Sequence, residues 1–363
     1  IFEVSIARIQ SVDILRGVTV ALMILVNNPG SWTYVYPALL HAHWDGLRLA
    51  DLVFPAFLFI VGLSVVFSLR VAKSSETARR AVLPKIMKRS ALLVLLGLAL
   101  NVIPEFNLQE LRWPGVLQRI GLVFAATALA YLWLTMKQRI VLVTFILLGY
   151  WLLLCYLPIP DTGHVSLAVS DNLPAWLDRQ LMSGHLWQNT KTWDPEGILS
   201  TLPAIATGII GSLAAELSFS RKPQTQLLML GIGLMAFGLI WQFYFPFNKA
   251  LWTSSYVLFT AGATSCIWVL FIAIYDHGKS PYFSLPFLAL GANPLLAYAG
   301  SELLAKLLFS MQWHGLSWSG HLFAVAQQVW PNQLASLSIG VLMVLFWMVI
   351  CLQLMRKGIR LKL

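Results

Sequence analysis

The polar residues between Asn27 and Pro55 are those whose types and spacing could do chemistry. This stretch joins two long apolar runs, yet it carries two histidines, His41 and His43, and two carboxylates, Asp45 and Asp51. Polar groups so close to lipid-compatible sequence are costly to bury unless they have partners, so such a cluster is by default a functional site. We therefore take the stretch as the candidate active centre of a membrane enzyme.

The two histidines leave three interpretations open. A single imidazole with an acidic partner such as Asp51 is a sufficient general base near neutral pH. Alternatively, His41 and His43 share a face of an extended segment, and with Asp45 they could ligate a metal. The other five histidines are scattered and add no ligand motif. The third interpretation is that both are ordinary loop histidines.

Two adjacent asparagines, Asn27 and Asn28, end the first apolar run directly before Pro29 and Gly30. This is ordinary helix-terminating sequence. The amide of Asn27 could equally orient or polarise a carbonyl, because it offers both a donor and an acceptor. Spacing alone does not choose between these roles.

Three cations stand at the edges of apolar runs. Arg16 follows Asp13 by three residues, which suits an intrahelical pair or contact with a phosphate-bearing ligand. Arg119 lies at the start of an apolar run, where a charge needs a carboxylate or phosphate partner. Lys249 precedes another run beside aromatic residues, as an interfacial anchor does.

Three carboxylates also lie at or within apolar runs. Asp194 and Glu196 open one run, where acidic residues favour the positive end of a helix. Glu302 follows a break at Asn293 and Pro294. A helix interrupted by proline and followed by a carboxylate usually faces the interior of its bundle.

Membrane helices must position these groups. The 363 residues are 58% hydrophobic and 11% charged, with a mean hydropathy of +0.74, which is too apolar for a soluble globular protein. A spanning helix needs about 20 mainly apolar residues, and lipid excludes open sheet edges. The sequence therefore predicts an all-α polytopic bundle of about ten spans, at residues 14–30, 52–70, 88–104, 116–135, 140–157, 197–217, 225–245, 252–275, 285–309 and 334–355.

The distribution of basic residues predicts the orientation. One set of alternating connections, with both chain ends, holds 18 of the 25 Lys and Arg residues, including Arg8, Lys279 and Lys362. Positive residues collect on the cytoplasmic side, so both termini are predicted there and 31–51 outside. Most acidic residues then fall outside, which favours a polar or cationic substrate on that face. The net charge of +10 therefore reports topology, and we expect no nucleic-acid partner.

We expect one transmembrane domain over residues 1–363. The 158–196 connection is the largest external piece, and its length and Pro, Gly, Asp and Trp content predict a cap over the bundle. The three cysteines show no CxxC or metal spacing and are expected in the core.

Seven blocks of the sequence resemble, in the same order, the membrane core of heparan-α-glucosaminide N-acetyltransferase and its bacterial homologues. They run from about residue 8 to 310 and read SVDILRG, LVNNPG, HAHWDGLRLADLVFPAFLFIVG, PGVLQRIG, WDPEGILSTLPAIATGIIG, NKALWTSSYVLFTAG and GANPLLAYAGSELL. The resemblance implies a membrane enzyme that takes acetyl-CoA and acetylates the amine of a glucosamine-type sugar or glycan at the external face, without a metal.

The resemblance also assigns residues. The family's catalytic histidine falls on His41 and its asparagine on Asn27. From the chemistry of such a base, we expect Asp51 or Asp45 to fix the histidine tautomer. His43 stands where the family has a smaller residue, and Asp45 where it has an asparagine. Cations for the phosphates of acetyl-CoA are Arg16, Arg119 and Lys249. Acceptor-binding residues are Trp44, Asp45, Asp194, Glu196 and Glu302.

Two mechanisms remain open, direct transfer in a ternary complex and transfer through an acetyl-histidine. The large external domain of the animal enzyme does not precede the core here, so we expect a protein of the bacterial inner membrane. By resemblance we also expect a homodimer. The alternative class is a transporter or flippase for a small sugar-like or anionic solute, because broken helices and midplane charges also mark such proteins.

Overall fold

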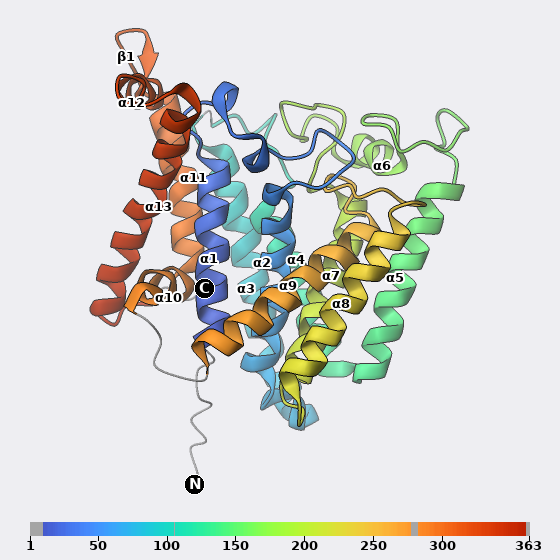
Figure 1. The fold of residues 1–363 in the computed structure, drawn as a ribbon. Helices are drawn as coiled ribbons and strands as arrows, with labels where there is room; N and C mark the ends of the chain where they lie inside the picture. Colours follow the sequence, from blue (N-terminus) through green and yellow to red (C-terminus); the bar gives the residue numbers. More distant parts are fainter. Residues whose placement is uncertain (1–9, 105, 277–281, 361–363) are drawn as a thin grey trace.

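Helices make up nearly all of the chain, seen in a computed structural model that describes residues 10–104, 106–276 and 282–360 (Figure 1). Within this part the strands are β1 (Gln312–Trp313) and β2 (Leu316–Ser317), which pair antiparallel. The α-helices are α1 (Gln10–Asn27), α2 (Leu49–Leu69), α3 (Glu76–Val102), α4 (Val116–Trp133), α5 (Met136–Tyr156), α6 (Leu173–Met182), α7 (Ile198–Leu217), α8 (Pro223–Trp241), α9 (Ser254–Tyr275), α10 (Leu285–Ala292), α11 (Pro294–Ser310), α12 (Trp318–Gln327) and α13 (Asn332–Arg356).

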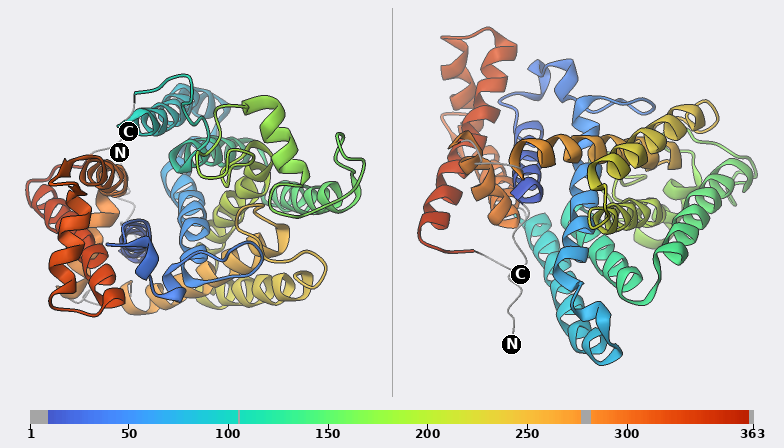
Figure 2. Two further views of the ribbon diagram at one scale, coloured as in Figure 1. Left: turned by 90° about the horizontal axis from the view of Figure 1, so that it is seen from above. Right: turned by 60° about the horizontal axis from the view of Figure 1, so that its bottom comes forward.

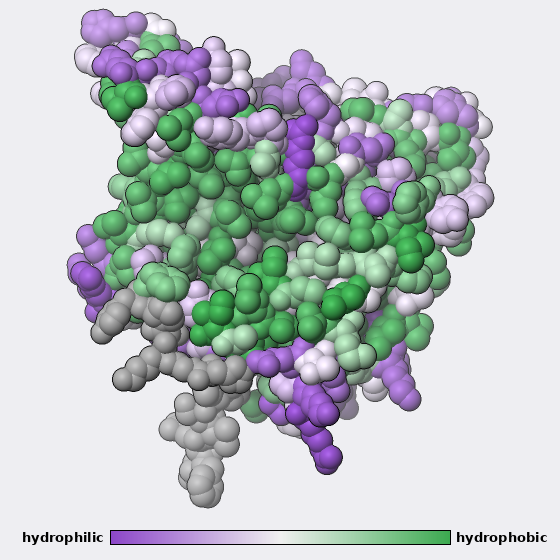
Figure 3. Space-filling model, in the orientation of Figure 1, coloured by the Kyte–Doolittle hydropathy of each residue, from purple (hydrophilic) through white to green (hydrophobic). Residues whose placement is uncertain are grey.

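The predicted spans all fall on helices, which confirms the all-α membrane bundle. Eight of the described helices are long and apolar enough to cross a membrane: α1, α2, α4, α5, α7, α8, α9 and α13. The predicted third span is the second half of α3, whose first half is basic. The ninth is divided at Asn293 into α10 and α11, as its proline predicts. An apolar belt separates two polar ends on the face seen in Figure 3.

Both ends of the described chain lie at one end of the bundle. The Gln10 end of α1 and the Arg356 end of α13 are at the bottom of Figure 1, whereas the connections 28–48 and 157–197 are at the top. An even number of passes follows. The cytoplasmic placement of the bottom end stays a prediction, and Arg8, Lys279 and Lys362, which were counted to that side, lie outside the described residues.

Helix α1 runs between two groups of helices. It packs against α10, α11 and α13 on one side and against α2 and α9 on the other (Figure 2). Helix α2 in turn lies close against α7, because a Cβ on Gly62 would meet the Gly208 carbonyl and one on Gly211 would meet the Phe59 carbonyl. The two helices therefore pack closely at their middles, and several candidate site residues lie at or next to their starts.

The connection between α5 and α7 contains α6, a helix that the sequence did not predict. It begins after Asn172, whose side chain accepts a hydrogen bond from the backbone nitrogen of Ala175. The connection lies at the same end of the bundle as the 28–48 segment (Figure 1). The Trp44 indole joins the two by donating to the Leu167 carbonyl at 2.8 Å. The short surface helix α12 was also not predicted.

Candidate active site

The side chain of Asp51 organises the start of α2. It is fully buried, and one of its oxygens accepts from the backbone nitrogens of Arg48, at 2.9 Å, and Ala42, at 3.1 Å. A carboxylate is favoured in the first turn of a helix, where the free N–H groups point outward. The local sequence therefore builds a buried anion directly behind His41.

The imidazole of His41 is bonded to this anion. Its Nδ1 lies 2.8 Å from Asp51 Oδ1, while 42% of the side chain remains exposed. Because an ionised carboxylate only accepts hydrogen bonds, Nδ1 carries the hydrogen and Nε2 is left as the proton acceptor of the ring. This is the tautomer that a general base requires. Asp51, and not Asp45, is thus the partner of His41.

Lys249 reaches the same imidazole from the connection between α8 and α9. Its Nζ lies 2.9 Å from Nε2 and 3.2 Å from Nδ1 of His41. Burial lowers the pKa of Lys249 below its ordinary value, although the carboxylates of Glu196 and Asp51 act in the opposite direction. The prediction that Lys249 binds donor phosphate gains no support from this position.

The segment containing Lys249 is joined to the segment containing His41. Asp45 and Asn248 form a β-bridge, and the Asn248 amide donates to Asp45 Oδ1 at 3.1 Å. The backbone nitrogen of Gly46 also donates to the Phe247 carbonyl at 2.7 Å. Asp45 therefore has a structural partner and does not approach the His41 ring through any contact that the structure gives.

Asn27 lies at the end of α1 and meets α11. Its amide donates to Glu302 Oε1 at 3.5 Å. Glu302 lines a pocket of about 330 Å³ together with Asn101, Arg112, Trp187 and Lys306, among others. The break at Asn293 places α11 so that Glu302 faces the bundle interior, as the sequence predicted.

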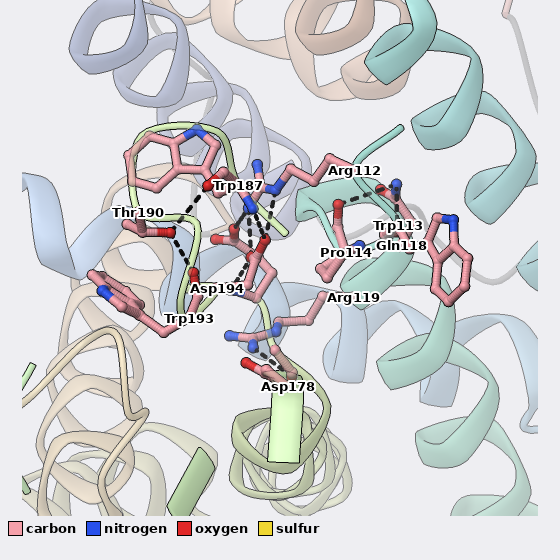
Figure 4. A network of polar contacts seen from close by, with 12 residues as sticks. Arg112, Trp113, Pro114, Gln118, Arg119, Asp178, Trp187, Thr190, Trp193 and Asp194 are labelled. Carbon is pink, nitrogen blue, oxygen red and sulfur yellow. Dashed lines mark hydrogen bonds and ion pairs between the residues drawn. The ribbon is translucent and has the colours of Figure 1, made fainter. Parts of the chain in front are cut away.

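An ion-pair network lies at the same end of the bundle (Figure 4). The Arg112 guanidinium donates to Asp194 at 2.6 and 2.8 Å and to Glu196 at 2.6 Å. Although burial opposes charge on each group, the paired carboxylates raise the pKa of Arg112 and the arginine lowers the pKa of Glu196. The network links the 103–115 connection to the start of α7 through charge-assisted hydrogen bonds.

Arg119 lies beneath this network with 1% of its surface exposed. It donates to the Gly197 carbonyl and to Ser200, and its guanidinium lies over the Trp252 ring at 5.1 Å. Asp178 lies nearby in Figure 4, and burial raises the pKa of this carboxyl to about 6. The role of Arg119 in binding donor phosphate gains no support from a position so deeply enclosed.

Arg16 lies far from this end of the bundle. Its guanidinium donates to Asp13 at 3.1 Å, to the Gly291 carbonyl at 3.1 Å and to Ser64 at 2.8 Å. Eleven residues of α1 separate it from Asn27, a rise of about 16 Å at 1.5 Å per residue. The predicted intrahelical pair with Asp13 is confirmed.

The structure thus brings most of the predicted residues to one end of the bundle. His41, Asp51 and Lys249 touch, Asn27 touches Glu302, and Trp44 packs edge-on against Trp193 with ring centres 5.2 Å apart. Sequence reasoning missed Arg112 and Asn248, whose partners lie 82 and 203 residues away along the chain. Their only local signals were a charge and an amide beside Trp or Pro.

The metal interpretation of the histidines can be compared with the geometry. Within residues 10–104, 106–276 and 282–360, no three His, Cys, Asp or Glu side chains gather as a ligand set. His41 is bonded to Asp51 and Lys249, and Asp45 is bonded to Asn248. The described contacts around His41 therefore suit proton transfer.

Fold and site together define a multi-pass membrane protein of helices with a histidine–carboxylate pair at one end of the bundle. Residues 8–178 match the family model described as heparan-alpha-glucosaminide N-acetyltransferase, catalytic. The chain is 29% identical to the heparan-alpha-glucosaminide N-acetyltransferase of Homo sapiens and 28% identical to that of Mus musculus. Each alignment covers 84% of this chain, and 54% and 55% of the respective relative, so the chain spans about half the length of these relatives. The resemblance seen in the sequence blocks is confirmed.

Proposed function

We propose that this chain is a membrane acetyltransferase that moves the acetyl group of acetyl-CoA to the amine of a glucosamine-type sugar. The single observation that carries the proposal is the His41–Asp51 pair, 2.8 Å apart, within the residues that match the catalytic family model. We place the reaction at the external face, on the end of the bundle where His41 lies.

His41 acts as the general base in this proposal. An alkylamine is mostly protonated at neutral pH, and it must lose a proton to attack a thioester. Nε2 of His41 takes that proton while Asp51 stabilises the imidazolium that forms. The amine nitrogen then bonds to the acetyl carbon, the carbon–sulfur bond breaks, and the thiolate of CoA takes up the second proton that the nitrogen loses as it becomes an amide. We favour direct transfer, because Nε2 is used for the proton.

Asn27 is suited to stabilise the negative oxygen of the tetrahedral intermediate. Its amide has two N–H donors, of which one faces Glu302, and removal of one such donor in known enzymes costs about 3–4 kcal/mol. The pocket lined by Glu302 adjoins this amide and is our candidate for the acceptor sugar. The carboxylate of Glu302 supplies the negative charge that an amino sugar requires.

The phosphates of the donor are assigned to the opposite end of α1. Arg16 lies there, half-buried, and it is close enough to Arg89 for the two positive charges to repel each other. An anion between two guanidinium groups relieves such repulsion and accepts their hydrogen bonds. A donor bound there would extend its thioester along α1 toward Asn27.

The wider setting is also part of the proposal. We propose that residues 1–363 act as a single transmembrane acyltransferase domain, with 158–196 as its external cap, in the inner membrane of a bacterium. We further propose a homodimer. A single subunit per particle in nanodiscs of native lipid would contradict that last statement.

The test compares two histidines two residues apart. His41→Ala should reduce acetyl transfer from acetyl-CoA to glucosamine by about 100-fold or more while acetyl-CoA still binds. His43→Ser is the matched control, because His43 is exposed and the structure gives it no polar contact. Equal loss in both variants, or no acetyl transfer by the purified wild-type protein in detergent, would refute the proposed function. Detergent also removes any contribution from transport.

A further inference from the structure

The amine of Lys249 lies against the His41 ring, next to the atom that an acceptor amine must approach. Nε2 of His41 is the ring atom that takes the proton of the acceptor, and Lys249 Nζ lies 2.9 Å from it. Nζ also lies 3.2 Å from Nδ1, so it sits over the face of the ring and must move into line with Nε2 before a proton passes. A primary amine of the protein is therefore already in contact with the base.

This position is built by the fold. Asn248, which is fully buried, holds the turn by donating from its backbone to Thr253 Oγ1 at 3.1 Å and accepting from the Leu251 nitrogen at 2.8 Å. Its side chain also donates to Asp45. The same turn holds Trp252 in the left-handed region at a φ of 53°. A bulky residue keeps this strained conformation only when the surrounding contacts hold the backbone in place. Lys249 is thus held between fixed neighbours and directed at His41.

The surroundings also make the ammonium of Lys249 easier to deprotonate. None of the ion pairs among the described residues includes Lys249, although the charges of Glu196, Asp51 and Arg119 act on it from the elements packed around it. Burial lowers the pKa of the amine. Lys306, on the same end of the bundle, differs because its ammonium donates to the carbonyls of Leu100 and Ile103.

We propose that Lys249 is itself an acetyl acceptor, modified by the donor when no sugar occupies the site. This proposal rests on the proposed function. His41 takes a proton from the Lys249 ammonium, the amine nitrogen bonds to the acetyl carbon of the thioester, and the carbon–sulfur bond breaks. The products are Nε-acetyl-Lys249 and CoA, whose thiolate takes up the second proton that the nitrogen loses as it becomes an amide, while His41 releases the first proton to water. No other reactant is required.

The test incubates the purified full-length protein with acetyl-CoA alone and locates acetyl groups by peptide mass spectrometry. We expect acetyl-Lys249 in the wild type and a loss of about 100-fold in its rate of formation in His41→Ala. Excess glucosamine should suppress the modification, because both amines need the same Nε2. Lys306 is the internal control and should stay unmodified, since its amine contacts carbonyl groups.

A second measurement on the same samples separates this proposal from the proposed function. Acetyl-glucosamine formed without any acetyl-Lys249 would overturn the lysine proposal alone. Acetyl-Lys249 formed without acetyl-glucosamine would support the lysine proposal and show that the acceptor class is wrong. Equal acetylation of Lys249 in the wild type and in His41→Ala would mean that acetyl-CoA reacts chemically without His41 and would overturn the lysine proposal. Absence of both products would overturn both.

Discussion

Replacing Asp51 by asparagine should reverse the tautomer of His41 and leave the fold in place. One oxygen of Asp51 accepts from two backbone nitrogens, and the other accepts from His41 Nδ1. An asparagine keeps both backbone bonds only if its oxygen faces those two N–H groups. Its NH2 group then faces Nδ1, which must become an acceptor. The ring hydrogen moves to Nε2, and the base is lost.

The expected magnitudes follow from these contacts. A general base contributes about 10²–10⁴-fold to the rate, so Asp51→Asn should raise the barrier by about 3–5 kcal/mol at 1.36 kcal/mol per tenfold. Stability should fall by only about 1–2 kcal/mol, because a charge-assisted bond and the favourable helix-terminal charge are lost while the backbone bonds remain. Asp51→Ala leaves three partly buried donors without their acceptor and should cost more, about 3 kcal/mol.

The assay is kcat for acetyl transfer to glucosamine, measured with thermal unfolding and acetyl-CoA affinity on the same preparations. Donor affinity should stay near the wild-type value in Asp51→Asn, because Arg16 contacts Ser64, which lies about 20 Å along α2 from Asp51. If Asp51→Asn kept more than a tenth of the wild-type kcat with an intact fold, the tautomer argument would be refuted. If it lost acetyl-CoA binding in proportion to kcat, Asp51 would serve donor binding instead.

Three further predictions concern the walls of the site. Arg112→Ala leaves the buried Asp194 without its guanidinium and should destabilise the fold by about 3–5 kcal/mol, seen as a large fall in the unfolding temperature; an unchanged temperature would contradict the network. Burial raises the pKa of Asp178 to about 6 from its ordinary 3.8, so between these two pH values the folded state binds more protons than the unfolded state. Its contribution to stability should therefore rise as pH falls through 6 and be complete below about 4, to a total of about 3 kcal/mol. Asp178→Asn should remove that part of the pH dependence of unfolding, and identical pH profiles for both proteins would refute it. Gly62→Ala should push α2 from α7 and lower the unfolding temperature by several degrees, whereas Gly233→Ala, where a Cβ meets no atom within 4 Å, should not; equal effects would argue against the close contact.

The sequence predicts the bundle well because its signal is local. Apolar runs of spanning length, and breaks such as Asn293 with Pro294, need no knowledge of distant residues. The short helices α6 and α12 were missed because each has only ten residues and lies outside the apolar runs. Their hydrophobic pattern is too brief to separate from a loop.

The site likewise contains contacts that the sequence can predict and contacts that it cannot. His41 and Asp51 are ten residues apart, so a carboxylate in the first turn of the following helix could be proposed as the partner from the sequence. The contact of Lys249 with His41 joins residues 208 positions apart. Composition and periodicity carry no information on such a pairing. The sequence therefore predicts donor phosphate as the partner of Lys249, and only the three-dimensional arrangement places this residue beside His41.

Helix α1 carries Arg16 near one end and Asn27 at the other, and the helix sets a fixed distance between these two side chains. If Arg16 holds the phosphates of the donor, the thioester must stand about 16 Å further along the helix. A short thioester such as S-acetyl-N-acetylcysteamine has no phosphates for Arg16 to bind, so nothing at Arg16 holds it near Asn27. In acetyl-CoA the bound phosphates and the length of the molecule place the thioester there. The enzyme would then select donors whose length matches the separation between Arg16 and Asn27. Insertion of one helical turn between these two residues would increase that separation by 5.4 Å.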